Sequence, residues 1–190
     1  MRGDCRWREW VAYQASAQKP TLLYLLLTRP FGHTIGPNLS FLFRWRRAVQ
    51  NPRMPSHFVT AENVQHGELP WCHVEWMSNP EVVGAKDILL VRATFQPGKM
   101  HKFHTHPARE EIIYVLEGTA EQWVGREKRI LQAGEMAHIP KDVAHATVNV
   151  GTVPLKFLAI LSPVEAPGEF SVDVFDQEPW CSLMADAVGR

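Results

Sequence analysis

Cysteine is scarce and scattered in this sequence. Cys5, Cys72 and Cys181 are odd in number and far apart, so they provide neither a disulfide framework nor a Cys-x-x-Cys metal knuckle. This usage fits a reducing compartment, and we expect the protein in the cytoplasm.

An excess of charge of either sign is also absent. Twenty basic residues balance twenty acidic ones over the whole chain. No net field favours binding to nucleic acid or to an anionic membrane surface, so we expect neither as a partner.

No run of apolar residues is long enough to cross a membrane. The run from Thr21 to Leu27 is far shorter than the ~20 residues that a spanning helix needs, and Pro20 and Pro30 enclose it. A secretory signal would end in a small-x-small cleavage site, whereas Thr28-Arg29-Pro30-Phe31 is bulky and charged. The sequence therefore favours neither a membrane anchor nor secretion.

The chain does have enough apolar residues for a core, and it divides into two parts of opposite charge. With 190 residues, of which 45% are hydrophobic, we expect one globular domain with an appendage. Residues 1–53 carry nine basic side chains against Asp4 and Glu9, a net charge of +7, and the rest of the chain has a net charge of −7. Residues 1–53 also lack periodicity. We expect them to be a disordered basic extension, or to precede a true translation start at Met54.

From Met54 onward, short runs rich in Val, Ile, Phe and Leu alternate with Gly or Pro, which predicts an all-β domain over residues 54–190. No window of a dozen residues shows a helical stripe. We place the barrel core at about residues 70–162 and a C-terminal strand and tail at 163–190. The predicted strands are Trp71–Met77, Ile88–Gln96, Glu111–Leu116, Thr119–Val124, Arg129–Leu131, Met136–Ile139, His145–Val150 and Leu155–Leu161.

Within this region lies a set of side chains suited to metal binding. His104 and His106 are two residues apart on a predicted strand, so they point to the same face. Glu111 opens the next strand after the turn at Pro107, and His145 lies on a later strand. Three imidazoles and one carboxylate are a suitable donor set for a first-row transition metal.

These residues occur in two motifs that resemble those of the cupin superfamily. Gly98, His104, His106, Glu111 and Gly118 match the first cupin motif, and Gly134, Pro140, His145 and Asn149 match the second. Only one pair of motifs is present, so the chain is similar to single-domain cupins of type 2. The resemblance implies a double-stranded β-helix, or jelly roll. It also implies one divalent transition metal ion, Fe, Mn, Ni, Cu or Zn, held by His104, His106, Glu111 and His145.

Several positions near the motifs are less certain in role. Asp142 stands where the second motif has glycine, and Asp tolerates the left-handed turn required there. Glu110 competes with Glu111, which we prefer because six residues then separate it from Gly118. His101 has the opposite strand parity to His104 and should face outward unless a bulge intervenes. His138 is either a pocket residue or part of the packing.

The resemblance implies a range of functions rather than one reaction. Our first hypothesis is a small metalloenzyme of dioxygenase-like type that acts on an oxygenated organic substrate in the barrel, although isomerase or lyase chemistry is also open. The alternative is a metal-dependent cupin that binds or senses a small molecule or sugar without turnover. No catalytic residue can be singled out.

We also expect a homodimer, because a small single barrel has edge strands that must be covered. The segment Phe170–Asp176 is prone to form a strand, and Trp71, Trp76 and Trp180 supply aromatic surface.

Overall fold

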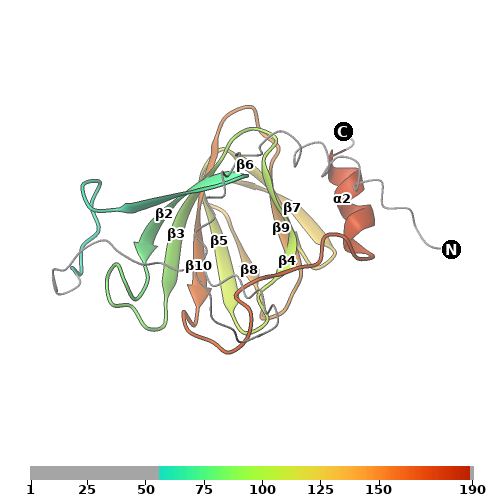
Figure 1. The fold of residues 1–190 in the computed structure, drawn as a ribbon. Helices are drawn as coiled ribbons and strands as arrows, with labels where there is room; N and C mark the ends of the chain where they lie inside the picture. Colours follow the sequence, from blue (N-terminus) through green and yellow to red (C-terminus); the bar gives the residue numbers. More distant parts are fainter. Residues whose placement is uncertain (1–55, 189–190) are drawn as a thin grey trace, which may run out of the picture. The chain divides into compact units, whose positions relative to one another are not determined.

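The computed structural model describes residues 56–188, so the predicted basic extension over residues 1–53 lies outside the described residues. The described part is mostly β-structure, with a short helix near its C-terminal end (Figure 1). No helix in this range is long and apolar enough to span a membrane. The elements are β1 (Gln65–Leu69), β2 (Cys72–Ser78), β3 (Leu89–Phe95), β4 (Met100–Thr105), β5 (Glu110–Glu117), β6 (Thr119–Val124), β7 (Glu127–Gln132), β8 (Met136–Ile139), β9 (His145–Asn149), β10 (Leu155–Ser162), β11 (Val172–Asp173) and α2 (Trp180–Val188).

The strands form two antiparallel sheets, ordered β1-β2-β3-β10-β5-β8 and β11-β4-β9-β6-β7 (Figure 1). Strands distant in sequence lie side by side: β10 separates β3 from β5, and β9 separates β4 from β6. Such crossovers are typical of a double-sheet jelly roll. The predicted all-β fold class is confirmed, and each of the eight predicted runs coincides with an observed strand.

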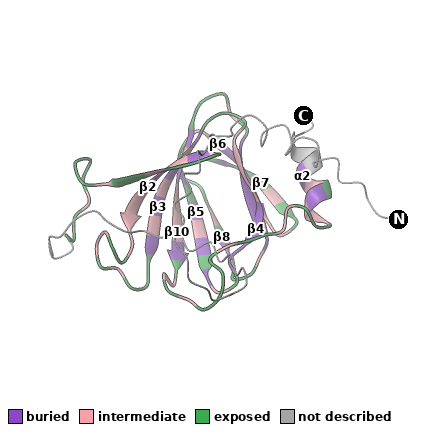
Figure 2. Ribbon diagram, in the orientation of Figure 1, coloured by how far each residue is buried: buried purple, intermediate pink, exposed green. Residues whose placement is uncertain are grey.

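The main core lies between the two sheets and follows from the period-two pattern of the strands. In β3, Leu89, Val91, Ala93 and Phe95 are buried while the residues between them are partly exposed. Figure 2 shows buried positions gathered along the central strands of both sheets. The largest fully buried apolar side chains of this core are Phe95, Val115, Ile139 and Leu155.

A second apolar cluster covers the opposite face of β4. Phe103, whose parity is opposite to that of His104, packs against Trp180 and Met184 of α2. Trp123 of β6 also belongs to this cluster. The sequence did not predict α2, because nine residues are too few to show a periodic stripe and the helix is stabilised by packing on the sheet.

The C-terminal segment returns to its own barrel. Its strand β11 is only two residues long, and it pairs with β4, Val172 opposite Thr105 and Asp173 opposite His104. In this structure the segment that we expected to cover a dimer edge therefore pairs within the chain, and the homodimer stays a prediction.

Residues of the second motif hold the turns around the site. Asp142 has a φ of 59°, so the left-handed turn expected at this non-glycine position is confirmed. Its backbone N–H donates to the carbonyl of His106 at 3.0 Å, which ties the second motif to the first.

Asn149 fastens the end of β9. Its buried side chain donates to the carbonyls of Phe95 and Val153, each at 2.9 Å, and accepts from the N–H of Gly151 at 2.9 Å. Three backbone groups, one at the end of β3 and two in the turn between β9 and β10, thus depend on one amide for their hydrogen bonds.

Asn149→Ala should lower the free energy of unfolding by roughly 2 to 4 kcal/mol, because it leaves the buried carbonyl of Phe95 and the part-buried carbonyl of Val153 without this donor. Urea denaturation monitored by Trp fluorescence measures this change. The matched control, Asn63→Ala, removes an exposed asparagine and should cost less than about 1 kcal/mol. A loss at position 149 no larger than the control would contradict this role.

A chain that begins at Met54 is expected to fold as the full chain does. The reason is that every strand of both sheets lies between residues 65 and 173 and pairs with another strand of that range. Circular dichroism and thermal unfolding should give the same spectrum and midpoint for both chains. Aggregation or a lower midpoint would show that residues 1–53 contribute to the core.

Candidate metal centre and its pocket

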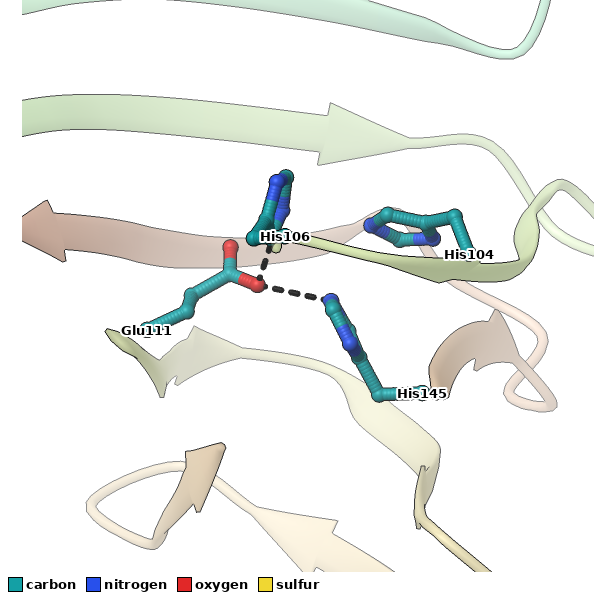
Figure 3. Close-up of side chains that lie close together, drawn as sticks. All are labelled: His104, His106, Glu111 and His145. Carbon is teal, nitrogen blue, oxygen red and sulfur yellow. Dashed lines mark ion pairs between the residues drawn. The ribbon is translucent and has the colours of Figure 1, made fainter. Parts of the chain in front are cut away.

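The structure brings the four predicted site residues together from three strands. His104 lies on β4 and His106 directly follows it, Glu111 lies on β5, and His145 on β9 is the register partner of His104. All four side chains are buried. One potential ligand atom from each residue can be chosen so that the four lie within 4.8 Å of one another, as in a site for one metal ion (Figure 3).

Backbone carbonyls fix the orientation of the three imidazoles. Nδ1 of His104 donates to the carbonyl of Lys102 at 2.8 Å, and Nδ1 of His145 donates to that of Val143 at 2.9 Å. Nδ1 of His106 donates to the carbonyl of Phe170 at 2.6 Å. Since a carbonyl only accepts, each Nδ1 carries a proton, and the neutral form of each imidazole then has its lone pair on Nε2, the arrangement that a metal-binding histidine requires.

The carboxylate of Glu111 faces these nitrogens directly. Its Oε2 atom lies 2.8 Å from Nε2 of His145 and 3.5 Å from Nε2 of His106 (Figure 3). Within residues 56–188, neither Glu111 Oε2 nor His145 Nε2 makes a hydrogen bond. Two electron-pair donors this close and removed from water repel each other unless a cation neutralises them. The donor set therefore fits a metal ion.

The environment also sets the charges of the ligands. Burial would raise the pKa of Glu111, but the imidazoles of His106 and His145 outweigh it and lower that pKa to about 2. Burial, helped by His101 and His145, holds the pKa of His104 well below its usual value. Burial would likewise lower the pKa of His106, but Glu111 raises it. At neutral pH the site thus offers a carboxylate and a neutral His104, and a metal ion competes with a proton at His106.

The two adjacent glutamates lie in different surroundings. Glu111 points into the cluster, whereas Glu110 is exposed and its Oε2 atom lies 3.5 Å from Nε2 of His138. His138, for which a pocket role was open, is half exposed on β8 and lies outside the cluster.

His101 lines a cavity next to the cluster. Strand alternation without a bulge would have placed its side chain on the outer face. A register shift in the pairing of β4 with β9 falls between His101 and His104, and this bulge turns His101 inward. Its ring stacks on that of His104 with centroids 3.6 Å apart, and on that of Trp71 at 4.1 Å. Burial, together with the nearby His145 and His106, lowers the pKa of His101 to about 3, so this imidazole is neutral.

The cluster forms one corner of a cavity of about 220 Å³ between the sheets. Apart from the cluster and His101, the wall is almost wholly apolar, and in the part of the chain that the structure describes it contains no Lys or Arg. Arg92 on β3 does not line the cavity and forms an ion pair with Glu75 at 2.6 Å. The apolar wall is formed by Leu69, Trp71, Val74, Trp76, Leu89, Val91, Ala93, Phe95, Ile113, Phe157, Ala159, Leu161 and Phe170.

The C-terminal segment closes one side of the centre, which the sequence could not show. Besides the hydrogen bond from His106 to Phe170, the guanidinium of Arg109 lies 4.6 Å from the Phe170 ring centroid. Arg109 is buried and donates to the carbonyls of Val164 and Glu169. Contacts between residues 55 to 64 positions apart leave no local pattern in a sequence.

Residues 91–161 match the family described as the cupin domain. These residues form a cupin domain. It is 35% identical to the polyketide synthase CurC of Streptomyces cyaneus over 45% of this chain and 55% of CurC. It is 33% identical to the oxalate decarboxylase OxdC of Bacillus subtilis over 40% of this chain and 21% of OxdC. This chain thus spans less than two thirds of the length of either relative.

Among solved structures, the cupin fold here resembles that of the polyketide cyclase RemF from Streptomyces resistomycificus, with a TM-score of 0.56. The two share 21% identity over 70% of this chain and 96% of RemF, so the likeness concerns the fold.

The full chain, stripped by a chelator and reconstituted, should bind one transition metal ion. Because the ion binds only the folded state, it should add about 2.7 kcal/mol to stability when free metal is at 100 times its Kd. Elemental analysis and thermal unfolding, with and without chelator, measure both effects. The His104→Ala, His106→Ala double variant should lose binding, while His138→Ala, which alters an exposed imidazole, should retain it. Wild-type metal content in the double variant would contradict the assignment.

Proposed function

We propose that this cupin is a metal-dependent enzyme of dioxygenase-like type, acting on a small, largely apolar organic molecule with oxygen atoms at one edge. The observation that carries the proposal is the composition of the cavity, which has a polar corner, formed by the candidate ligands and His101, and walls that are otherwise mostly apolar. Such a cavity orients a substrate by its polarity, with its oxygens at the cluster and its carbon skeleton against the apolar wall.

The size of the cavity favours a molecule of about one ring. A cavity of about 150 Å³ lined by apolar residues admits benzene, and the cavity here measures about 220 Å³. Phe95 packs edge-on against both Trp71 and Phe157, which gives this part of the wall a fixed aromatic surface.

The same wall disfavours a small dianion such as oxalate. A second carboxylate would find no guanidinium or ammonium group to neutralise it among the described residues of the wall, because the polar side chains there besides the cluster are uncharged. Burying a charge without a partner costs several kcal/mol. Similarity to an oxalate decarboxylase therefore does not imply that this protein acts on oxalate.

A first-row transition metal ion held by His104, His106, Glu111 and His145 supplies Lewis acidity, and redox chemistry if it is Fe, Mn, Ni or Cu. The other residues of the site position the ligands and shield the substrate. The carbonyls of Lys102, Val143 and Phe170 hold the imidazoles in one tautomer, and the apolar wall excludes water from the reacting molecule.

A second candidate is metal-dependent cyclisation without oxygen consumption. The observation that favours it is the likeness to CurC, whose name refers to a polyketide synthase, since oxygenated carbon skeletons suit this cavity. The third candidate, binding without turnover, needs the same four ligands but no reaction.

Oxygen uptake separates these candidates. Protein loaded with Fe(II), Mn(II), Ni(II), Cu(II) or Zn(II) should consume oxygen with at least one catechol, enol or β-diketone and none with oxalate. The His104→Ala, His106→Ala variant should be inactive. A product formed without oxygen uptake would replace the proposal with cyclisation, binding without any product would support the sensing role, and turnover of oxalate would contradict the substrate class.

A further inference from the structure

His101 is held in one orientation at the edge of the metal cluster. Its ring is nearly parallel to those of Trp71 and His104, with interplanar angles of 14° and 26°. Centroid distances of 4.1 Å and 3.6 Å allow this only if the two rings cover opposite faces of the imidazole. The ring edge, which carries both nitrogens, is what remains to meet an occupant of the cavity, and His101 lines that cavity.

The hydrogen-bonding capacity of this edge is unused. A neutral imidazole has one N–H donor and one acceptor nitrogen. His104, His106 and His145 each donate from Nδ1 to a backbone carbonyl, whereas no side-chain hydrogen bond among residues 56–188 involves a ring nitrogen of His101. His101 is also outside the group of four residues whose ligand atoms converge.

Three other polar side chains line the cavity, those of Cys72, Thr147 and Ser171, and of these the hydroxyl of Ser171 is likewise without a hydrogen bond among residues 56–188. The hydroxyl of Thr147 donates to Oε1 of Gln122 at 2.7 Å. The thiol of Cys72 is a weak donor, and burial raises its pKa to about 12, so it stays protonated. His101 is thus well placed to recognise an oxygen atom beside the cluster.

We propose that His101 is a substrate-binding residue, whose ring edge hydrogen-bonds one oxygen of the substrate while an adjacent oxygen faces the cluster of His104, His106, Glu111 and His145. This assignment rests on the proposed function and narrows its substrate class to planar molecules with two neighbouring oxygens, such as catechols and enolised diketones. The stack with Trp71 and His104 fixes the imidazole in advance, so little conformational entropy is lost on binding.

The test uses the full chain loaded with Co(II) and the probe 4-nitrocatechol, whose absorption band shifts when it binds a metal. His101→Phe keeps a flat ring in the stack but removes both nitrogens, and should weaken probe binding about threefold to tenfold. His101→Gln restores an N–H donor and should recover most of the affinity. His138→Phe, made on an exposed imidazole, is the matched control and should bind as wild type does.

The outcomes are distinguishable. If the wild-type protein binds Co(II) but not 4-nitrocatechol, the substrate class of the proposed function is wrong, and this inference fails with it. If wild type and His101→Phe bind the probe equally, or if His101→Gln binds as weakly as His101→Phe, the proposed function stands and the role of His101 is rejected. If His101→Phe lowers the Co(II) content or changes the Co(II) spectrum without probe, His101 is a metal ligand and the assignment is overturned.

Discussion

The arrangement of the site depends on the close, buried contact between the carboxylate of Glu111 and Nε2 of His145. Two electron-pair donors lie 2.8 Å apart, shielded from water and without hydrogen-bond partners among the described residues. Removing such groups from water costs several kcal/mol unless a cation is shared between them. The rest of the fold holds this arrangement in place: β4 and β9 pair to set His104 opposite His145, and the N–H of Asp142 ties the turn of the second motif to the carbonyl of His106.

The jelly roll places this polar cluster at the wall of a mostly apolar cavity. The difference in polarity between the two parts of the wall determines how a bound molecule is oriented. The sheet containing β4 and β9 supplies three imidazoles, while β3 and β10 of the other sheet supply aliphatic and aromatic side chains such as Val91 and Phe157. A substrate should therefore bind with its polar end at the cluster and its apolar end against these side chains. The cavity is also closed on one side by the segment around Phe170, which orients His106 through its carbonyl.

The sequence predicted the features that depend on local pattern. Strand alternation gave the eight main strands, and the spacing of the motifs identified the four residues that the structure brings together. It missed features that depend on distant contacts or on irregular backbone. The bulge between His101 and His104 reverses strand parity, so His101 lies inward. Strand β1 is mostly polar and exposed, and α2 is too short to show a helical stripe. Arg109 meets residues 55 and 60 positions away.

The most direct test of a metal centre at this cluster is a crystal structure of the metal-loaded protein, with data collected at the absorption edge of the bound metal. We expect a single anomalous peak at about 2.0 to 2.2 Å from Nε2 of His104, His106 and His145 and from a carboxylate oxygen of Glu111. No peak at the cluster in protein that contains stoichiometric metal, or a peak held by other residues, would contradict the account.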